Sequence, residues 1–419
     1  MIKNAFLLIL VIITLVVVVA IGITTRICMN TYARSKKSNT QINPFKNETR
    51  FITLAMAKFL DDMEREKPIR FNTQQLREAT RNFTTVLGSG GFGTVYKGIF
   101  SNGTIVAVKV LNGSSEKRIE EQFMAEVSTM GRTHHFNLVR LYGFCFESSL
   151  RALVYEYMVN GSLDTHLFQA NKEAIIGFEK LHEIAVGTAR GIAYLHEECP
   201  QRIVHYDIKP GNILLDLNFC AKVADFGLAK LCNRDNTHIT MTRGRGTPGY
   251  AAPELWMPLP ITHKCDVYSY GMLLFEIIGR RNMDVRLGGS QEWFPVWAWH
   301  KYENKHLKEL MMVCGVEEND EELVDRMLMV ALCCVQYRPE NRPAMSMVVK
   351  MLEGALDVPK PANPFSYMLS GVSDGSDYCA RISLNAGDSD WSSSEVGTKS
   401  VMVNGTPLMK RYEITMASE

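Results

Sequence analysis

The sequence predicts an α+β protein in which a β-rich half is followed by a helical half. Between residues 86 and 158, short runs of β-branched and aromatic residues alternate with glycine-containing turns, which is typical of strands. Residues 178–195 instead repeat apolar residues at steps of three and four, the period of an amphipathic helix. A further helix is expected over residues 266–278, a very apolar stretch that suits the centre of a helical core.

Composition argues against two classes of protein. The 419 residues are 46% hydrophobic, which is enough for a large core, and 46 Lys and Arg are balanced by 45 Asp and Glu. The net charge of +1 argues against a protein that binds nucleic acid through bulk charge, so we expect no nucleic-acid partner. The ten cysteines show no CxxC spacing, which favours reduced thiols over a disulfide or zinc framework.

Residues 5–25 form a nearly unbroken apolar run of Leu, Ile and Val. This length suits a helix that crosses the hydrocarbon core of a bilayer, and it exceeds the usual apolar region of a signal peptide. No small-x-small cleavage site follows closely. We therefore expect a single retained transmembrane helix, with a cleaved signal peptide as the alternative.

Basic residues flank this run unequally. One precedes it, Lys3, and four follow it closely, Arg26, Arg34, Lys36 and Lys37. The positive-inside rule places the segment after the run in the cytoplasm and residues 1–4 outside. We expect a single-pass protein of the plasma membrane that contacts the lipid bilayer through residues 5–25 and has no ligand-binding ectodomain of its own.

Residues 26–84 are expected to form a cytoplasmic juxtamembrane segment. It is polar and basic at first, and a short helix is expected at 51–67, either lying on the membrane or forming a solvated linker. A second helix is expected to begin near Asn72, with Leu76 and Ala79 on one face.

A glycine-rich motif, GxGxxGxV, opens the β-rich half. It comprises Leu87, Gly88, Ser89, Gly90, Gly91, Phe92, Gly93, Thr94 and Val95. GxGxxG alone also marks dinucleotide-binding enzymes, but there a helix follows the glycines. Here residues 94–97 continue as β-type sequence toward an Asn102-Gly103 turn, which indicates a hairpin. A glycine-rich hairpin lets backbone amides approach a triphosphate closely.

One lysine, Lys109, lies inside the β-branched run of residues 105–111. A charge in the middle of such a run needs an anionic partner, because otherwise it loses its hydration without compensation. The next helix is expected at 121–132.

The helical half contains two polar loops. Residues 205–212 read HYDIKPGN, and Asp225-Phe226-Gly227 follows about a dozen residues later. An aspartate such as Asp207 can accept the proton of an attacking hydroxyl. The amide of Asn212 and the carboxylate of Asp225 are hard oxygen ligands suited to Mg²⁺, which bridges nucleotide phosphates. The pattern predicts phosphoryl transfer.

Together these motifs resemble those of protein kinases. The resemblance covers residues 85–355 and implies a bilobal kinase fold behind the transmembrane helix. Its β-rich N-lobe would occupy about 85–158 and its helical C-lobe about 159–355. "FNTQQLREATRNF" and "IVHYDIKPGNILLD" are similar to segments of plant receptor-like kinases, among them the leaf-rust resistance kinase-like group.

The resemblance assigns roles to individual residues. Lys109 would contact the α- and β-phosphates of ATP and pair with Glu126, with Glu120 and Glu121 as alternatives. The implied catalytic residues are Lys109, Glu126, Asp207, Lys209 and Asn212. The implied magnesium ligands are Asn212 and Asp225. The implied ATP-binding residues are Leu87, Gly88, Ser89, Gly90, Gly91, Phe92, Gly93, Val95, Ala107, Lys109, Glu156, Met158 and Leu214. Adenine would bond the backbone of residues 156–158, with Tyr155 behind it.

The resemblance also implies an activation segment. Its candidate regulatory or positioning residues are Thr237, Thr240, Thr242 and Thr247. Glu254 would pair with a buried Arg342, and a buried Asp266 would cap loop backbone.

Most kinases carry arginine where this chain has Tyr206, and that arginine binds a phosphorylated activation-loop residue. We therefore expect activity that does not require this phosphate–arginine switch.

The sequence thus predicts a membrane-anchored receptor-like serine/threonine kinase. It would use ATP and Mg²⁺ to phosphorylate Ser and Thr hydroxyls of proteins, in plant defence or cell-surface signalling, with a membrane co-receptor. The alternative is a kinase-like scaffold, which the presence of Lys109, Asp207, Asn212 and Asp225 disfavours.

Residues 356–419, rich in Ser, Gly and Asp, are expected to be a disordered tail. Three tryptophans, Trp293, Trp297 and Trp299, are expected in the C-lobe core, with a docking surface as the alternative.

Overall fold

The computed structural model describes residues 68–113, 115–168, 176–233, 246–256, 260–279, 284–287 and 290–366. The expected transmembrane helix at 5–25 and the helix at 51–67 lie outside these residues, as do three of the activation-segment threonines. Among the residues described, none of the helices combines the length and apolar character that a membrane span requires.

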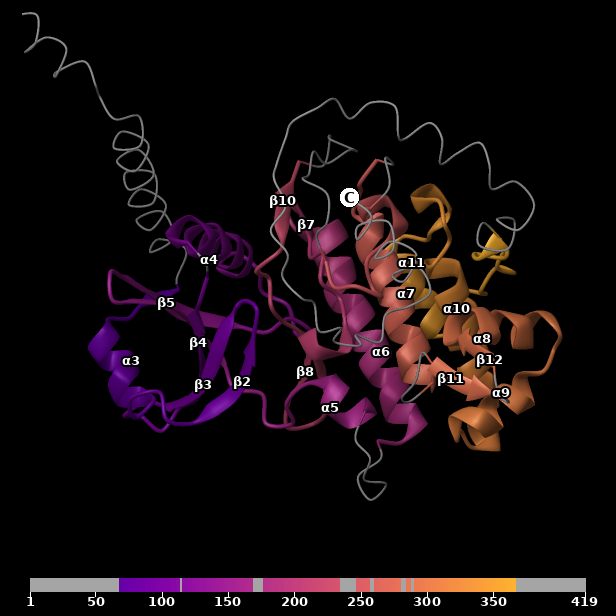
Figure 1. The fold of residues 1–419 in the computed structure, drawn as a ribbon, viewed down its shortest axis with the longest axis horizontal. Helices are drawn as coiled ribbons and strands as arrows, with labels where there is room; N and C mark the ends of the chain where they lie inside the picture. Colours follow the sequence, from indigo (N-terminus) through magenta and orange to yellow (C-terminus); the bar gives the residue numbers. More distant parts are fainter. Residues whose placement is uncertain are drawn as a thin grey trace, which may run out of the picture. The chain divides into compact units, whose positions relative to one another are not determined.

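The N-terminal half of the described chain is built on one six-stranded sheet, ordered β1-β5-β6-β4-β3-β2 (Figure 1). The strands are β1 (Ile69–Arg70), β2 (Val86–Gly90), β3 (Gly93–Ile99), β4 (Ile105–Leu111), β5 (Leu141–Glu147) and β6 (Leu150–Glu156). Only β1 pairs in parallel, with β5; the other pairs are antiparallel. The strand expected at 105–111 has those bounds, and the predicted β-rich N-lobe is confirmed.

Two helices cover opposite faces of this sheet, α3 (Thr73–Ala79) and α4 (Glu116–Met130) (Figure 1). The alternation of side chains along β5 explains the arrangement. Cys145 packs in the same apolar cluster as Leu76 of α3, whereas Phe144 contacts Phe123 of α4 with 5.6 Å between ring centroids. Each helix therefore buries its apolar side against alternate residues of the same strand.

Helix α4 begins five residues before the start expected from the sequence and ends two residues earlier. The Oγ of Ser115 accepts a hydrogen bond from the backbone N–H of Arg118, which satisfies one amide of the first turn. This cap lets the polar first turn, Glu116–Ile119, join the helix although it carries little apolar periodicity. Glu120, Glu121 and Glu126 consequently all lie on α4.

The C-terminal half is mainly helical and contains α5 (Leu163–Leu167), α6 (Phe178–Ala193), α7 (Lys264–Gly279), α8 (Phe294–Glu303), α9 (Leu307–Cys314), α10 (Glu321–Cys334) and α11 (Met345–Leu352). Helix α7 lies at its centre, and every residue from Cys265 to Phe275 is buried. This agrees with the very apolar helix expected at 266–278. Three two-stranded ladders complete the lobe: β7 (Arg202–Val204) with β10 (Lys230–Cys232), β8 (Ile213–Leu215) with β9 (Ala221–Val223), and β11 (Asp284–Leu287) with β12 (Ser290–Trp293).

Ordered packing continues beyond the domain ends expected from the sequence. At the N-terminal end, residues 68–80 add β1 and α3 to the N-lobe. At the C-terminal end, Phe365 is 1% exposed and packs edge-on against Trp293, with 5.4 Å between ring centroids. The side chain of Gln336 also donates to the carbonyl of Ala362 at 2.9 Å. Residues 356–366 are thus part of the folded C-lobe.

The tryptophans expected in the C-lobe core are buried there. Trp293, Trp297 and Trp299 are all 5% exposed or less. Trp297 packs against Phe294, with 5.7 Å between ring centroids. The alternative of a docking surface formed by these three side chains is therefore wrong.

Candidate active site

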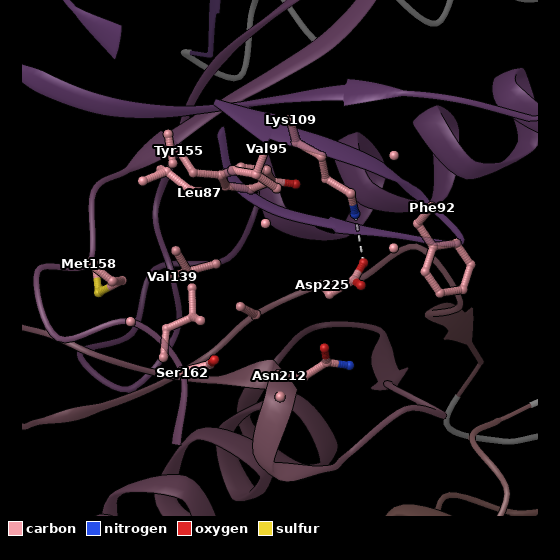
Figure 2. Close-up of a pocket in the computed structure, with 18 of the residues that line it drawn as sticks. Leu87, Phe92, Val95, Lys109, Val139, Tyr155, Met158, Ser162, Asn212 and Asp225 are labelled. Atoms are coloured by element: carbon pink, nitrogen blue, oxygen red, sulfur yellow. Dashed lines mark hydrogen bonds and ion pairs between the residues drawn. The ribbon is translucent and has the colours of Figure 1, made fainter. Parts of the chain in front are cut away.

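A cavity of about 530 Å³ lies between the glycine-rich hairpin and the polar loops of the C-terminal half (Figure 2). All of the residues that the resemblance implied for ATP are found around it. The cavity is also lined by Tyr157, within the segment expected to bond adenine, and by Gly211 of the HYDIKPGN motif. Other lining residues were not singled out by the sequence: Val139, Val159, Gly161, Ser162, Thr165 and Ala224. These come from loops and strand ends with no motif of their own, so no sequence signal distinguished them.

The glycine-rich motif forms a hairpin, as expected, and no helix follows it. β2 and β3 pair antiparallel from Val86 to Tyr96, with Gly90 opposite Gly93. Gly93 has a φ of +142°, and a Cβ at this position would lie 2.2 Å from the carbonyl oxygen of Val110. Only glycine fits there. At Gly88 and Gly91 a Cβ would meet nothing within 4 Å, so the backbone of the loop is open to a ligand.

Three charged groups from three separate elements meet at the inner end of the cavity. The Nζ of Lys109, on β4, lies 2.6 Å from a carboxylate oxygen of Glu126 and 2.7 Å from one of Asp225. Figure 2 shows Lys109 reaching across the cavity to Asp225. The hydroxyl of Tyr155 donates to the second carboxylate oxygen of Glu126. Glu126 is therefore the partner of Lys109, and the alternatives Glu120 and Glu121 are wrong.

Burial and charge act against each other in this cluster. Burial alone would lower the pKa of Lys109, but the carboxylates of Glu126 and Asp225 raise it above its ordinary value. Burial alone would raise the pKa of Asp225, but Lys109 lowers it. Lys109 is thus a cation and Asp225 an anion at neutral pH, as contact with phosphates and a metal ion requires.

Three polar side chains surround the carboxylate of Asp207, two from the loop at 205–212 and one from the activation segment. Asp207 is 3% exposed and accepts from Lys209 at 2.8 Å, from the amide of Asn212 at 2.9 Å and from the hydroxyl of Thr247 at 2.5 Å. Lys209 also donates to Thr247 at 2.7 Å. Thr247, a candidate positioning residue of the activation segment, therefore contacts both Asp207 and Lys209.

A second buried carboxylate holds the backbone of this loop. Asp266, at the start of α7, accepts from the backbone N–H groups of His205 and Tyr206, each at 2.8 Å, and lies 2.9 Å from Nε2 of His196. The expected capping role of Asp266 is confirmed. Tyr206 has a φ of +66° and Asp225 one of +63°. Such left-handed backbone costs about 1–3 kcal/mol per residue and persists where surrounding contacts fix it.

The donors at the floor of the cavity fit a magnesium ion. Asn212 and Asp225 lie one above the other in Figure 2. The amide nitrogen of Asn212 is engaged by Asp207, which fixes the orientation of the side chain. Mg²⁺ is commonly held by one or two protein oxygens together with phosphates and water, so two oxygen donors beside an open cavity suit it.

The end of the activation segment is anchored in the C-lobe core. Glu254 and Arg342 are fully buried and form two hydrogen bonds of 2.6 and 2.9 Å, the pairing implied by the resemblance. The hydroxyl of Tyr250 donates to Glu276 of α7 at 2.5 Å. Thr237, Thr240 and Thr242 lie outside the described residues.

Comparison with known sequences decides the family. The sequence model for protein tyrosine and serine/threonine kinases matches residues 82–352. The chain belongs to this kinase family. The β-sheet N-lobe and helical C-lobe are the bilobal kinase fold expected from the sequence, and the domain is that of a protein serine/threonine kinase that uses ATP and a divalent metal.

Several relatives are receptor-like kinases of plants. The kinase is 46% identical to a G-type lectin S-receptor-like serine/threonine-protein kinase of Arabidopsis thaliana over 76% of its own length and 39% of the relative's. It is 45% identical to rust resistance kinase Lr10 of Triticum aestivum, over 75% and 50%. It is 44% identical to the Arabidopsis leaf rust 10 disease-resistance locus receptor-like protein kinase-like 2.2, over 71% and 47%. The chain therefore spans half or less of these relatives.

Burial raises the pKa of Glu276 from 4.5 to about 7. Between these values the unfolded chain has lost a proton that the folded kinase retains, so this group's contribution to stability falls as pH rises from about 4.5 to about 7. We expect Glu276→Gln, which keeps an acceptor for Tyr250, to raise the free energy of unfolding on the order of 1–3 kcal/mol at pH 8 and little at pH 5.

Thermal unfolding of the full chain in detergent at both pH values measures this difference. Glu340→Gln, at an exposed carboxylate, is the matched control and should be neutral. A Glu276→Gln gain in stability that was equal at pH 5 and pH 8 would contradict the prediction.

Proposed function

We propose that this chain is a membrane-anchored, receptor-like serine/threonine kinase that transfers the γ-phosphoryl of ATP to Ser and Thr hydroxyls of proteins. One observation carries the proposal. The Lys109 cluster lines the same cavity beneath the glycine-rich hairpin as Lys209 and Asn212, which both donate to Asp207.

Each polar group has a role suited to its surroundings. Asp207 accepts or orients the hydroxyl proton of the substrate, because its carboxylate is held in place by three donors. Lys109 contacts the α- and β-phosphates while Glu126 fixes its ammonium. Asn212 and Asp225 would hold Mg²⁺, which neutralises charge on the phosphates. Lys209 neutralises the transferring phosphoryl. Catalysis on this arrangement is mainly positioning and charge stabilisation.

Selectivity for Ser and Thr is supported by Lys209 and by the relatives. Lys209 bridges Asp207 and Thr247, and a lysine at this place resembles serine/threonine kinases rather than the tyrosine-specific group. Of the relatives given above, the G-type lectin S-receptor-like kinase is named a serine/threonine-protein kinase. The other two are named a rust resistance kinase and a disease-resistance receptor-like kinase. The scaffold alternative is not favoured, because Lys109, Asp207, Asn212 and Asp225, groups that inactive kinase domains lose, are all present. Lys109 contacts Asp225, and Asn212 contacts Asp207.

Replacing Asp207 tests the activity directly. We expect Asp207→Asn to lower phosphoryl transfer by about 10²–10⁴-fold, because an amide cannot accept the hydroxyl proton. The measurement is mapping of phosphosites by mass spectrometry after incubating the full chain with ATP and Mg²⁺, together with radiolabel transfer to a protein substrate. Asp357→Asn, at an exposed site, should match the wild type. Equal low transfer by wild type and Asp207→Asn would favour the scaffold.

We also propose that the phosphate–arginine switch is absent from this kinase. Tyr206 is 2% exposed and carries no charge with which to bind a phosphate. The loop backbone at Tyr206 is instead held by Asp266, through a bond that needs no phosphorylation.

The triple variant Thr237→Ala, Thr240→Ala and Thr242→Ala should therefore retain phosphoryl transfer within a few-fold of the wild type. Asp207→Asn serves as the inactive reference in the same assay. Loss of turnover in the triple variant, with thermal unfolding unchanged, would show that an activation-loop phosphate is needed after all.

The apolar run at 5–25 supports the proposed single-pass anchor, with the kinase domain in the cytoplasm. The names of the relatives, which include receptor-like and rust resistance kinases, support a defence or cell-surface role, and a membrane co-receptor is part of the same proposal. We expect the full chain, expressed in plant cells, to stay in the membrane pellet after alkaline carbonate extraction, and a chain lacking residues 5–25 to be released. Proximity labelling from the same membranes should recover a receptor. Release of the full chain would contradict the anchor.

A further inference from the structure

Residues 68–80, here called the N-terminal strap, lie outside the part of the chain that matches the kinase family, 82–352. The strap comprises β1, Phe71 and α3 (Figure 1). Helix α3 begins with a capping box, in which Asn72 and Gln75 each accept from the backbone N–H of the other. The strap is thus a folded element with its own start signal.

The strap is fixed to β5 by backbone contacts at close range. Ile69 and Arg70 pair in parallel with Gly143 and Phe144, and the N–H of Phe71 donates to the carbonyl of Phe144 at 2.8 Å. A Cβ at Gly143 would lie 2.0 Å from the carbonyl oxygen of Ile69 and 2.7 Å from the ring of Phe71. The presence of glycine at 143 is therefore what allows the strap to approach β5.

Side chains extend the same attachment. Leu76 is fully buried in an apolar cluster with Val106, Val108 and Cys145 on the outer face of the sheet. The ring of Phe71 stacks on a second aromatic ring, that of Phe100, with 5.1 Å between centroids.

At the end of β5, the carboxylate of Glu147 accepts from both the N–H and the hydroxyl of Thr73, at 3.2 and 2.5 Å. The strap therefore contacts β5 near its middle, at Gly143 and Phe144, and at its C-terminal end, at Glu147.

The opposite face of β5 supports the helix that carries Glu126. Phe123 of α4 is fully buried against Phe144 and Phe146, with ring centroids 5.6 and 4.8 Å away. Glu126 lies three residues after Phe123, hence about one helical turn along α4. Without the strap, β5 would be an edge strand with unpaired backbone groups, and edge strands move and exchange more readily.

We propose that the N-terminal strap is a positioning element for the kinase reaction, which sets the place of Glu126 through β5 and α4. The docked strap fixes β5, β5 fixes Phe123, and α4 then presents Glu126 to Lys109. The effect of the strap on the rate of phosphoryl transfer rests on the proposed kinase function, whereas its effect on the stability of β5 and α4 does not. Because the strap follows directly on residues 1–67, it also transmits to the N-lobe any constraint placed on the preceding segment.

A pair of substitutions at Thr73 tests the proposal without touching the catalytic residues. Thr73→Val has the same shape but loses the hydroxyl that donates to Glu147, whereas Thr73→Ser keeps it. Gly143→Ala is a stronger variant, because its Cβ collides with the strap. Gln74→Ala is the control, since Gln74 is exposed and its side chain bonds only Glu78 within α3.

The first readout is amide hydrogen exchange of the full chain in detergent, which needs no turnover. We expect Thr73→Val to speed exchange in α3, β5 and α4 several-fold and Gly143→Ala tenfold or more. Exchange in α7 should not change, and Thr73→Ser and Gln74→Ala should match the wild type. If exchange rose in α3 alone while α4 stayed as protected as in the wild type, the strap would only cover the sheet and the proposal would be overturned.

The second readout is the rate of phosphoryl transfer. We expect kcat/KM for ATP to fall about tenfold in Gly143→Ala and less in Thr73→Val, with KM for the protein substrate unchanged, because the Lys109–Glu126 pair serves the nucleotide. Unchanged kcat/KM for ATP alongside a loosened α4 would also overturn the proposal. If the wild type itself transferred no phosphoryl, the proposed function would fail while the exchange data still tested the strap.

Discussion

The buried ammonium of Lys109 is the constraint on which the N-lobe depends. Its strand is apolar, and the side chain is 7% exposed, so the charge is tolerated only with its carboxylate partners in place. Removing one partner from such a buried pair costs about 3–5 kcal/mol. Glu126 comes from α4 and Asp225 from the C-lobe, so Lys109 joins the helix and the sheet of the N-lobe to the Asp225-Phe226-Gly227 loop.

The C-lobe also contains buried carboxylates whose charge is compensated by donors, in one case backbone N–H groups and in the other an arginine. Asp266 stabilises the left-handed turn at Tyr206, and Glu254 fixes the end of the activation segment through Arg342. Both carboxylates are completely buried, so each has to be matched by donors from a distant part of the chain. Asp266 therefore holds the loop that carries Asp207 from the interior of the lobe.

Much of the site could be predicted because its residues conflict with their local surroundings. A lysine in a β-branched strand and a glycine cluster before β-type sequence have few explanations outside a nucleotide site, and Lys109 and Gly93 are found where those patterns indicated. Val139 and Ala224 line the same cavity but are ordinary apolar residues, so nothing in the sequence separates them from the core. Strand β1 has only two residues, and its pairing partners on β5 are 74 positions away. The packing of Phe365 on Trp293 likewise depends on contacts distant in sequence.

Tyr155 closes the inner end of the nucleotide cavity with a ring whose hydroxyl is already bonded to Glu126. An ATP-competitive inhibitor with an apolar arm directed past this ring would have to displace it and leave a buried carboxylate oxygen without its donor. That loss costs about 1–3 kcal/mol, or more for a charged group, and offsets what the arm gains by burial. Selective compounds for this kinase should therefore grow away from Tyr155, toward the side of the cavity lined by the exposed Val159.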